Sequence, residues 1–254
     1  MPSVGALVLT CNEEVNIQAC LESISWCNEI VVVDSFSKDN TVEICRKYTD
    51  KIFPHAFKDF ASQRNFGLDK ITSDWVLVVD ADERVTFELR DEIKQIINVE
   101  TNVAGYKIPR RNYFLGKWIK HCGWYPDYTL RLFKNNSILF TGLVHEKVEL
   151  DGNIKKIKNP FIHYTYRNIN QFINKADHYT TLDAYEMHKN GKKFKISDVL
   201  VNPLWRFIRM YFIKQGFMDG IQGFILSILY FFYAFLKYIK LWEISKQPYN
   251  NSSL

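Results

Sequence analysis

The sequence predicts an α/β fold with a mostly parallel sheet and helices on both of its faces. Runs of consecutive apolar residues such as "IVVV" and "WVLVV" alternate with segments in which apolar residues recur at three- and four-residue spacing. Continuous apolar runs are typical of strands buried on both faces, and the alternation is typical of a parallel sheet connected by helices. The chain has 254 residues, 47% of them hydrophobic and 24% charged, which suffices for one sizeable domain and an appendage.

The first eighty residues are expected to follow the order β-α-β-α-β-α-β. The elements are a strand over 3–10, a helix after "CNEE" that Asn12 can cap, a strand over 29–34, a helix with Val42, Cys45 and Tyr48 on one side, a strand near 51–53, a helix over 59–70 and a strand over 75–80.

Polar side chains stand where the predicted strands end. Thr10 ends the first strand, Asp34 the second and Asp80 the fourth. Ligands in open α/β sheets bind beyond the carboxyl ends of the strands, so we expect these side chains to meet in one crevice. An acidic crevice repels the phosphates of a nucleotide unless a divalent cation lies between them, and carboxylate oxygens are preferred ligands of Mg²⁺ and Mn²⁺. "DAD" alone is a weak signal, because acids are common in surface turns and helix caps, but its combination with Asp34 and "TCNEE" favours a metal site.

The carboxyl-terminal segment is basic and rich in large apolar residues. Residues 187–254 hold ten Lys/Arg against three Asp/Glu, so the remaining residues sum to −2. "PLWRFIRMYFIKQGF" has the spacing of an amphipathic helix, and the apolar run over 224–236 is shorter than the roughly 20 residues that cross a bilayer. The basic flanks favour helices that lie on a membrane surface, and the alternative is that both helices pack on the protein. The chain has no recognised nucleic-acid motif, so we expect no nucleic-acid partner.

Two further features favour a cytoplasmic protein. The five cysteines form no CxxC pair and no repeated spacing, which indicates neither a zinc site nor a disulfide framework. The amino terminus has no basic region before its apolar run and no small-residue cleavage pattern, so it predicts a first strand and not a signal peptide.

Several motifs, in order, resemble the nucleotide-sugar-binding half of family 2 glycosyltransferases. They are "LVLTCNEEVNIQACLESI", "IVVVDSFSKDNTVEIC", "QRNFGL" and "WVLVVDADERV". Further along, "WYPDYTLRLFKNN", "FTGLVHEKVEL" and "FIHYTYRNINQFINKADHYT" resemble the subgroup that contains the bacterial lipopolysaccharide inner-core β-glucosyltransferases, as does the tail "RFIRMYFIKQGFMDGIQGF".

The resemblance implies the GT-A fold and sugar transfer with inversion at the anomeric carbon. By position, the nucleotide-sugar site would comprise Thr10 and Glu13 at the nucleoside, Asp34 at the base or ribose, Arg64 beside the nucleotide and Asp80 at the ribose. Asp82 would hold the Mg²⁺ or Mn²⁺ ion, so "DAD" would be the DXD motif of the family.

Inversion requires a base that takes the proton of the acceptor hydroxyl. By its order among the motifs, Asp127 resembles that base, with Glu146 as the runner-up and His145 as the late metal ligand or a diphosphate contact. Pro126 departs from the commoner paired-acid form. In the structural alternative, Asp127 starts a turn and pairs with Arg131. If Asp127 is the base, Arg131 would instead clamp the diphosphate.

Other residues near these motifs keep two interpretations each. His163, inside "PFIHYTY", is expected to be a structural histidine. Trp118, Trp124 and Tyr125 could stack on a sugar ring or fill the core beneath the acceptor loop.

We therefore expect a metal-dependent transferase that moves a hexose, with glucose as the first candidate, from a UDP-sugar to a glycolipid such as the lipopolysaccharide core. Residues 1–196 would form the catalytic domain, with 1–100 as the nucleotide-sugar half and 101–196 as the acceptor half, and 197–254 the basic helical region. The enzyme would be peripheral on the cytoplasmic face of the inner membrane. The alternatives are a family 2 transferase for a polyprenyl-phosphate or capsule glycan and a non-catalytic nucleotide-binding scaffold.

Overall fold

The computed structural model describes residues 1–99, 102–135, 138–141 and 147–246. The chain forms two compact units. Unit 1 comprises Met1–Arg111 and Pro126–Tyr164, and unit 2 comprises Asn112–Tyr125 and Thr165–Leu254. Both units are therefore assembled from two separate stretches of chain. The compact units divide the chain at other positions than residue 196. The functional boundary that we expect at residue 196 stays a prediction.

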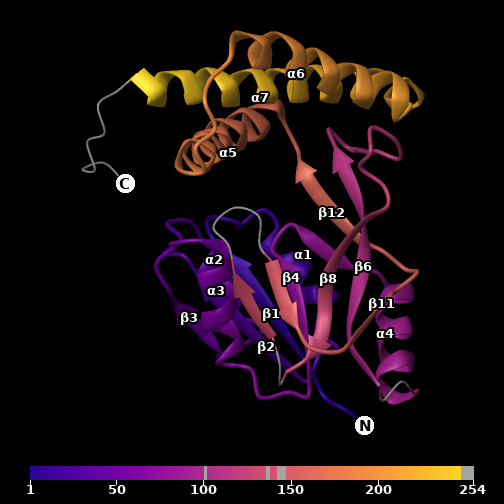
Figure 1. Cartoon of the computed structure of the whole chain (residues 1–254). Helices are drawn as coiled ribbons and strands as arrows, with labels where there is room; N and C mark the ends of the chain where they lie inside the picture. The colour runs from indigo at the N-terminus through magenta and orange to yellow at the C-terminus, as the bar shows by residue number, and fades with distance from the viewer. Residues whose placement is uncertain (100–101, 136–137, 142–146, 247–254) are drawn as a thin grey trace. The chain divides into compact units, whose positions relative to one another are not determined.

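Unit 1 is built on a mixed sheet whose parallel half has the strand order β3-β2-β1-β4 (Figure 1). These strands are β1 (Val4–Thr10), β2 (Glu29–Asp34), β3 (Ile52–Pro54) and β4 (Trp75–Asp80). The sheet continues with β8 (Asp127–Lys134), β6 (Val103–Phe114), β12 (Phe161–Tyr166) and β5 (Glu83–Val85), while β11 (Asn153–Lys156) and β7 (Lys117–Trp118) pair with β6. Strands β9 (Ile138–Thr141) and β10 (Lys147–Leu150) form a separate antiparallel pair.

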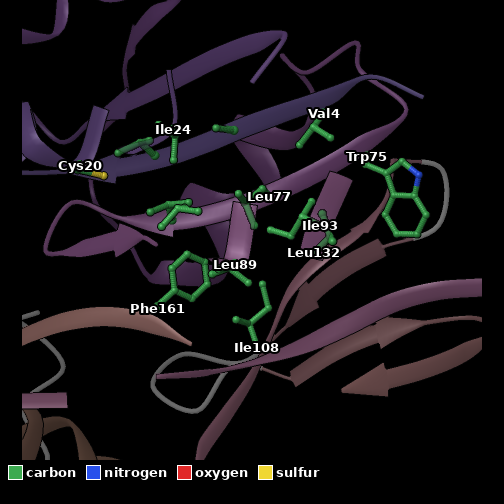
Figure 2. Packing of buried hydrophobic residues seen from close by; sticks show 14 of the residues in the cluster. Val4, Cys20, Ile24, Trp75, Leu77, Leu89, Ile93, Ile108, Leu132 and Phe161 are labelled. Carbon is green, nitrogen blue, oxygen red and sulfur yellow. The ribbon is translucent and has the colours of Figure 1, made fainter. Parts of the chain in front are cut away.

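Helices cover both faces of this sheet. Because successive side chains of a strand point to opposite faces, each strand contributes to two cores. Ala6 and Val8 of β1 face the layer of α1 (Ile17–Ser23), α2 (Thr41–Cys45) and α4 (Phe87–Val99). Leu7 faces the other layer, which contains α3 (Phe60–Leu68). Figure 2 shows the first of these cores, in which Leu77 of β4 packs near Leu89 and Ile93 of α4. The predicted fold class and the predicted order of the first seven elements are both confirmed.

Two local details differ from the sequence predictions. Asn12 does not cap a helix, because α1 begins at Ile17 and Asn12 takes a positive φ of 54° while its side-chain oxygen accepts a hydrogen bond from the Lys38 N–H at 2.7 Å. Helix α2 ends at Cys45, so Tyr48 lies in the following turn. Asp59 does cap α3, where its carboxylate accepts a hydrogen bond from the Ser62 N–H at 2.7 Å.

Unit 2 is a helical assembly with a core of its own. It contains α5 (Ile169–Lys189), α6 (Ile196–Ile208), a π-helical turn η1 (Arg209–Ile213), a 3₁₀ turn η2 (Gly216–Asp219) and α7 (Gly220–Lys246). In Figure 1, α6 and α7 lie side by side, and α5 packs against α7. The core joins Phe114, Ile119 and Cys122 from the middle of the chain to Met210 and Leu226 from its end. Residues 112–125 thus depend on the carboxyl-terminal helices for their packing.

A buried carboxylate fixes this middle segment. Asp219, 2% exposed, accepts hydrogen bonds from the backbone N–H of Lys120 at 3.2 Å and of His121 at 2.8 Å, and its Oδ1 lies 3.1 Å from His121 Nδ1. The Lys117 ammonium donates to the Asp219 carbonyl oxygen at 2.6 Å. Residues 117–121 are therefore held by η2.

Two helices, α6 and α7, lie in the carboxyl-terminal region that the sequence predicts to be helical. Pro203 lies inside α6, where its missing N–H removes one helical hydrogen bond. Helix α7 has 27 residues, so it extends well past the apolar run over 224–236. The stretch Gly216–Lys246 is long and apolar enough to cross a membrane by length and composition.

Candidate active site

The predicted nucleotide residues lie at adjacent strand ends of unit 1. In the parallel register Thr10 of β1 pairs with Asp34 of β2, and Leu9 pairs with Asp80 of β4. The three polar side chains therefore follow three neighbouring strands at the same edge of the sheet. This arrangement is the one that the sequence predicts, although the part that each residue takes in binding stays a prediction.

The first two strand ends differ in how their polar groups are satisfied. Asp34 is 4% exposed and accepts hydrogen bonds from the Ser37 N–H at 2.9 Å and from the Ser37 hydroxyl. Thr10 is 5% exposed, and its hydroxyl oxygen has no hydrogen-bond partner among the described residues. Because buried hydroxyls are normally hydrogen-bonded, the Thr10 hydroxyl is a candidate contact for a bound molecule. Glu13, in contrast, accepts a hydrogen bond from the Asn16 side chain at 2.6 Å, so it helps to shape the loop after β1.

Asp80 lies between two arginines. The Arg131 guanidinium of β8 donates to both of its oxygens, and Arg64 of α3 donates to Oδ1 at 3.3 Å. Burial would raise the pKa of the Asp80 carboxyl, but the charges of Arg131 and Arg64 lower that pKa well below its usual range. Burial would likewise lower the pKa of the Arg131 guanidinium, and the carboxylates of Asp80 and Glu83 raise it above its usual value. The two arginines thus favour the ionised form of Asp80, whose side chain is still 29% exposed.

Glu83 connects this group to the predicted base. Its side chain is fully buried, and its oxygens accept hydrogen bonds from the Asp80 N–H at 3.0 Å and from Arg131 at 3.2 Å. Arg110 of β6 lies 3.6 Å from Glu83 and donates through two N–H groups to Asp127 Oδ2. Carboxylates and arginines therefore alternate from Arg64 through Asp80, Arg131, Glu83 and Arg110 to Asp127.

This network corrects one alternative from the sequence. The ion-pair partner of Asp127 is Arg110, which stands opposite it in the β6–β8 register, and not Arg131. Arg131 points instead to Asp80 and Glu83. Both of these arginines are held by carboxylates of the site.

Asp82 lies in the turn between β4 and β5, beside a histidine that the sequence analysis treated as structural. Its Oδ2 is 3.5 Å from the Nε2 of His163 in β12, and its carbonyl oxygen accepts a hydrogen bond from the Tyr164 N–H at 3.0 Å. The two side chains are 14% and 12% exposed. The antiparallel pairing of β12 with β5 brings them together. Carboxylate oxygens suit Mg²⁺ and Mn²⁺, and imidazole nitrogens suit transition metals, so a carboxylate beside an imidazole fits Mn²⁺ better than Mg²⁺.

No group of three His, Cys, Asp or Glu side chains that could hold a metal is found among the residues that the structure describes. His145 and Glu146, the predicted late metal ligand and runner-up base, lie outside the described residues. Of the two predicted metal ligands, Asp82 lies within the described residues, and its neighbour there is His163, which was not predicted as a ligand.

The aromatic residues of the predicted acceptor loop divide into two groups within unit 2. Trp124 packs in the core against Phe114, Tyr166 and Tyr230, which favours the core interpretation for this residue. Trp118 and Tyr125 meet edge to face at 5.3 Å and are both partly exposed.

The sequence alone did not predict Glu83, Arg110 or the proximity of His163 to Asp82. Arg131 did carry a signal, since a charged residue inside the apolar strand "TLRLF" needs a buried partner. The identity of that partner depends on the register between β4, β8 and β6, which one sequence does not display.

Removal of Arg131 is expected to destabilise the protein. Arg131→Met would leave Glu83 buried and would remove the closest cation from Asp80, and breaking a buried ion pair costs about 3–5 kcal/mol of the free energy of unfolding. The cost should be visible as a fall of the thermal midpoint by about 6–20 °C. Thermal unfolding followed by circular dichroism checks this.

The matched control for that measurement is Arg90→Met, because Arg90 makes a surface ion pair with Asp91 on α4. Exposed pairs contribute about 1 kcal/mol or less. Equal midpoints for the two variants would contradict the buried network.

The chain is similar in sequence and in fold to known glycosyltransferases. The family model "Glycosyl transferase family 2" matches residues 6–146, more than half of the chain. The lipopolysaccharide core biosynthesis glycosyltransferase LpsC of Rhizobium meliloti is 28% identical over 94% of this chain and 92% of its own length. An uncharacterized glycosyltransferase of Rickettsia typhi is 29% identical over 98% of this chain and 90% of its own.

Among solved structures, glucosyl-3-phosphoglycerate synthase from Mycobacterium tuberculosis in complex with Mn²⁺, uridine-diphosphate and glucosyl-3-phosphoglycerate shares the fold, with a TM-score of 0.50 and 13% identity over 76% of this chain and 81% of that one. The complex of the same enzyme with phosphoglyceric acid gives a TM-score of 0.51 over the same shares of the two chains. The protein is therefore a glycosyltransferase enzyme with the GT-A fold, and the chain belongs to glycosyl transferase family 2.

Proposed function

We propose that this enzyme transfers a hexose, with glucose as the first candidate, from a UDP-sugar to a glycolipid, with inversion at the anomeric carbon. The observation that carries the proposal is that Thr10, Asp34 and Asp80 lie at the ends of neighbouring strands. Asp82 follows Asp80 closely in the chain, and the pairing of β12 with β5 brings His163 beside Asp82. The buried Thr10 hydroxyl, with no partner among the described residues, supports a ligand contact there. A relative in fold was solved with uridine-diphosphate and Mn²⁺, which supports the donor class.

Asp82 and His163 would hold a divalent cation, Mg²⁺ or Mn²⁺, with His145 as a further candidate ligand. When bound, such a cation neutralises charge on the departing diphosphate as a Lewis acid. The chain's own residues complete the donor site: Asp80, kept ionised by Arg131 and Arg64, can accept hydrogen bonds from the ribose hydroxyls through its exposed part. Arg64, which also stacks over Phe140 with its Cζ 5.4 Å from the ring centre, would border the nucleotide.

Asp127 would take the proton of the acceptor hydroxyl as the sugar is transferred. The hydrogen bonds from Arg110 hold the Asp127 carboxylate in a fixed orientation. A general base must be positioned in this way to accept the proton in the transition state. Glu146 remains the runner-up for this step.

The acceptor that we propose is an anionic glycolipid such as the lipopolysaccharide core. LpsC, similar over nearly the full length of both chains, bears the name of a lipopolysaccharide core enzyme. The basic carboxyl-terminal helices suit an anionic membrane surface, so we place the enzyme in the cytoplasm, peripheral on the inner membrane. A polyprenyl-phosphate or capsule glycan acceptor is the near alternative, since it would use the same donor site.

A mass-shift screen tests donor and acceptor together. The purified protein is incubated with UDP-, GDP- or TDP-sugars, membrane glycolipid extract and Mn²⁺, and the glycolipids are weighed by mass spectrometry. We expect a gain of one hexose only with a UDP-hexose and only without a chelator. Transfer from another nucleotide sugar would overturn the donor assignment, and donor binding without release of UDP in any mixture would favour the scaffold.

A further inference from the structure

The helices of unit 2 present their apolar residues outward. On α6 and η1, Leu200, Leu204 and Phe212 are 66%, 53% and 56% exposed, whereas Val199 and Met210 on the opposite side are buried. Helices of water-soluble proteins have the reverse arrangement, with the apolar side turned to the core.

Helix α7 shows the same pattern. Ile221, Ile228 and Phe232 are 63%, 44% and 42% exposed, and they recur at helical spacing. The opposite side of the helix carries the buried Leu226 and Ala234. We call Leu200, Leu204, Phe212, Ile221, Ile228 and Phe232 the apolar face.

The two parts of this face adjoin within unit 2. The ring of Phe224 on α7, 41% exposed, lies 5.6 Å from the ring of Tyr211 and 6.3 Å from that of Phe207. In Figure 1 the two helices run alongside each other. Exposed apolar side chains that gather on neighbouring helices mark interaction surfaces.

The charge around the apolar face identifies its partner. Residues 192–214 contain six Lys/Arg and one acid, Asp198, and Asp198 already pairs with Lys192 at 3.2 Å. Arg209 and Lys214 are exposed beside the apolar residues. A basic helix with an exposed apolar face and an interfacial tryptophan, here Trp205 at 53% exposure, is typical of proteins that insert into the headgroup region of an anionic bilayer.

A second copy of the chain is a poorer partner for this face. A two-fold contact places the same patch of both subunits together, so Arg209 and Lys214 of each copy would approach like charges. A bilayer with anionic lipids offers apolar chains and negative headgroups at once.

The side of α7 that faces α5 argues against a helix that spans the bilayer. Lys240 donates to the Asp177 carboxylate at 2.7 Å and to the Thr181 hydroxyl at 2.7 Å, and the Tyr233 hydroxyl donates to Asp183 at 3.0 Å. These groups would have to leave α5 if α7 crossed the membrane alone, at a cost for each unpaired polar group. Helix α7 therefore keeps its polar contacts if it lies parallel to the membrane surface.

We propose that the apolar face of α6, η1 and α7 inserts into one leaflet of an anionic bilayer, with both helices parallel to the membrane plane. This inference rests on the proposed function for its biological setting, since a glycolipid acceptor is reached at such a surface. It specifies which side chains enter the lipid and in which orientation.

Flotation of the full-length protein with lipid vesicles tests the proposal. Vesicles of phosphatidylcholine with phosphatidylglycerol should bind the protein, and vesicles of phosphatidylcholine alone should bind it much more weakly. Leu204→Ser should weaken binding by about 10- to 100-fold, because burying a leucine side chain contributes about 1.5–3 kcal/mol. Arg209→Gln should weaken it about fivefold, in keeping with about 1 kcal/mol for each basic residue near an anionic surface.

Matched controls come from unit 1. Phe87→Ser removes an apolar side chain that is 76% exposed on α4, and Lys47→Gln removes an exposed charge beyond α2; neither should change vesicle binding. Equal binding of Leu204→Ser and Phe87→Ser, or binding that ignores phosphatidylglycerol, would overturn the proposal. A wild-type dimer in sedimentation that Leu204→Ser converts to monomer would assign the face to a second copy instead.

Two further measurements separate the orientation and the function. Bound protein that high salt and carbonate release from the vesicles supports helices in the membrane plane, and protein that resists both treatments would indicate a spanning helix. Mn²⁺-dependent release of UDP from UDP-sugars, measured without lipid, should be unchanged in Leu204→Ser. A wild-type protein that binds vesicles but releases no UDP would reject the proposed function and would still support the lipid-binding surface.

Discussion

Asp82→Asn is expected to lower turnover about 1,000-fold while the protein stays folded. Asparagine keeps the size and one oxygen of the side chain, so it can still lie beside His163, but it lacks the charge that a divalent cation requires. Loss of metal stabilisation at a departing diphosphate costs several kcal/mol of transition-state energy, and 1,000-fold corresponds to about 4 kcal/mol. The rate of UDP release from a UDP-hexose at rising Mn²⁺ concentrations measures the effect.

The matched control for Asp82 is Asp91→Asn. Asp91 lies on the surface of α4, where its side chain is 64% exposed, and its substitution should leave turnover unchanged. If Asp82→Asn kept more than a tenth of the wild-type rate at the same thermal midpoint, the metal assignment would be wrong. His163→Asn should raise the Mn²⁺ concentration needed for half-maximal activity if His163 is a ligand, and should leave it unchanged if His163 is structural.

The variant Asp127→Asn is expected to lower kcat for sugar transfer by about 100- to 10,000-fold, which is the range for removal of a general base. The donor KM should change little, because the nucleotide residues lie at the ends of β1, β2 and β4. Asparagine can still accept a hydrogen bond from Arg110, so the β6–β8 pairing should survive. Steady-state kinetics with donor and glycolipid acceptor varied separately give both constants.

Glu146→Gln is the comparison that decides between the two candidate bases. If Asp127 is the base, Glu146→Gln should retain far more activity than Asp127→Asn. The reverse order of activities would transfer the assignment to Glu146. Asp151→Asn, in an exposed position after β10, serves as the control and should behave as the wild type.

The donor half of the fold was predictable because its signals are local. The strands "VGALVLT", "EIVVVD" and "WVLVVD" are apolar along their whole lengths, and each of them ends in the polar residue that the structure places at the sheet edge. Parallel neighbours then follow from the alternation with helices.

The ion-pair network was not predictable, because its members come from distant strands. Arg131 reaches Asp80 and Glu83 only through the pairing of β8 with β4, where Leu132 stands opposite Leu77. A one-residue shift of this register would turn Arg131 to the other face of the sheet. The same reason hid His163, which meets Asp82 through the pairing of β12 with β5.

The carboxyl-terminal helices were predicted from their apolar spacing, but their bounds were not. Helix α6 runs through Pro203, although proline is rare inside helices. The spacing of apolar residues identifies a helix face, but it does not say whether that face is turned inward or outward. The structure decides the direction: Val199 and Leu226 fill the interior, and Leu204 and Ile228 are exposed.

The dependence of residues 112–125 on α6 and α7 has a consequence for synthesis on the ribosome. Unit 1 is complete once Tyr164 has emerged, so it can fold while translation continues. The partners Met210 and Leu226, and Asp219 that holds residues 117–121, are synthesised about 90–110 residues after Phe114 and Ile119. At ribosomal speed this is a delay of roughly 5–20 s. During that interval Phe114 and Ile119 lack the neighbours that bury them. The segment that carries Trp118 and Tyr125 is therefore among the last parts of the chain to fold during synthesis.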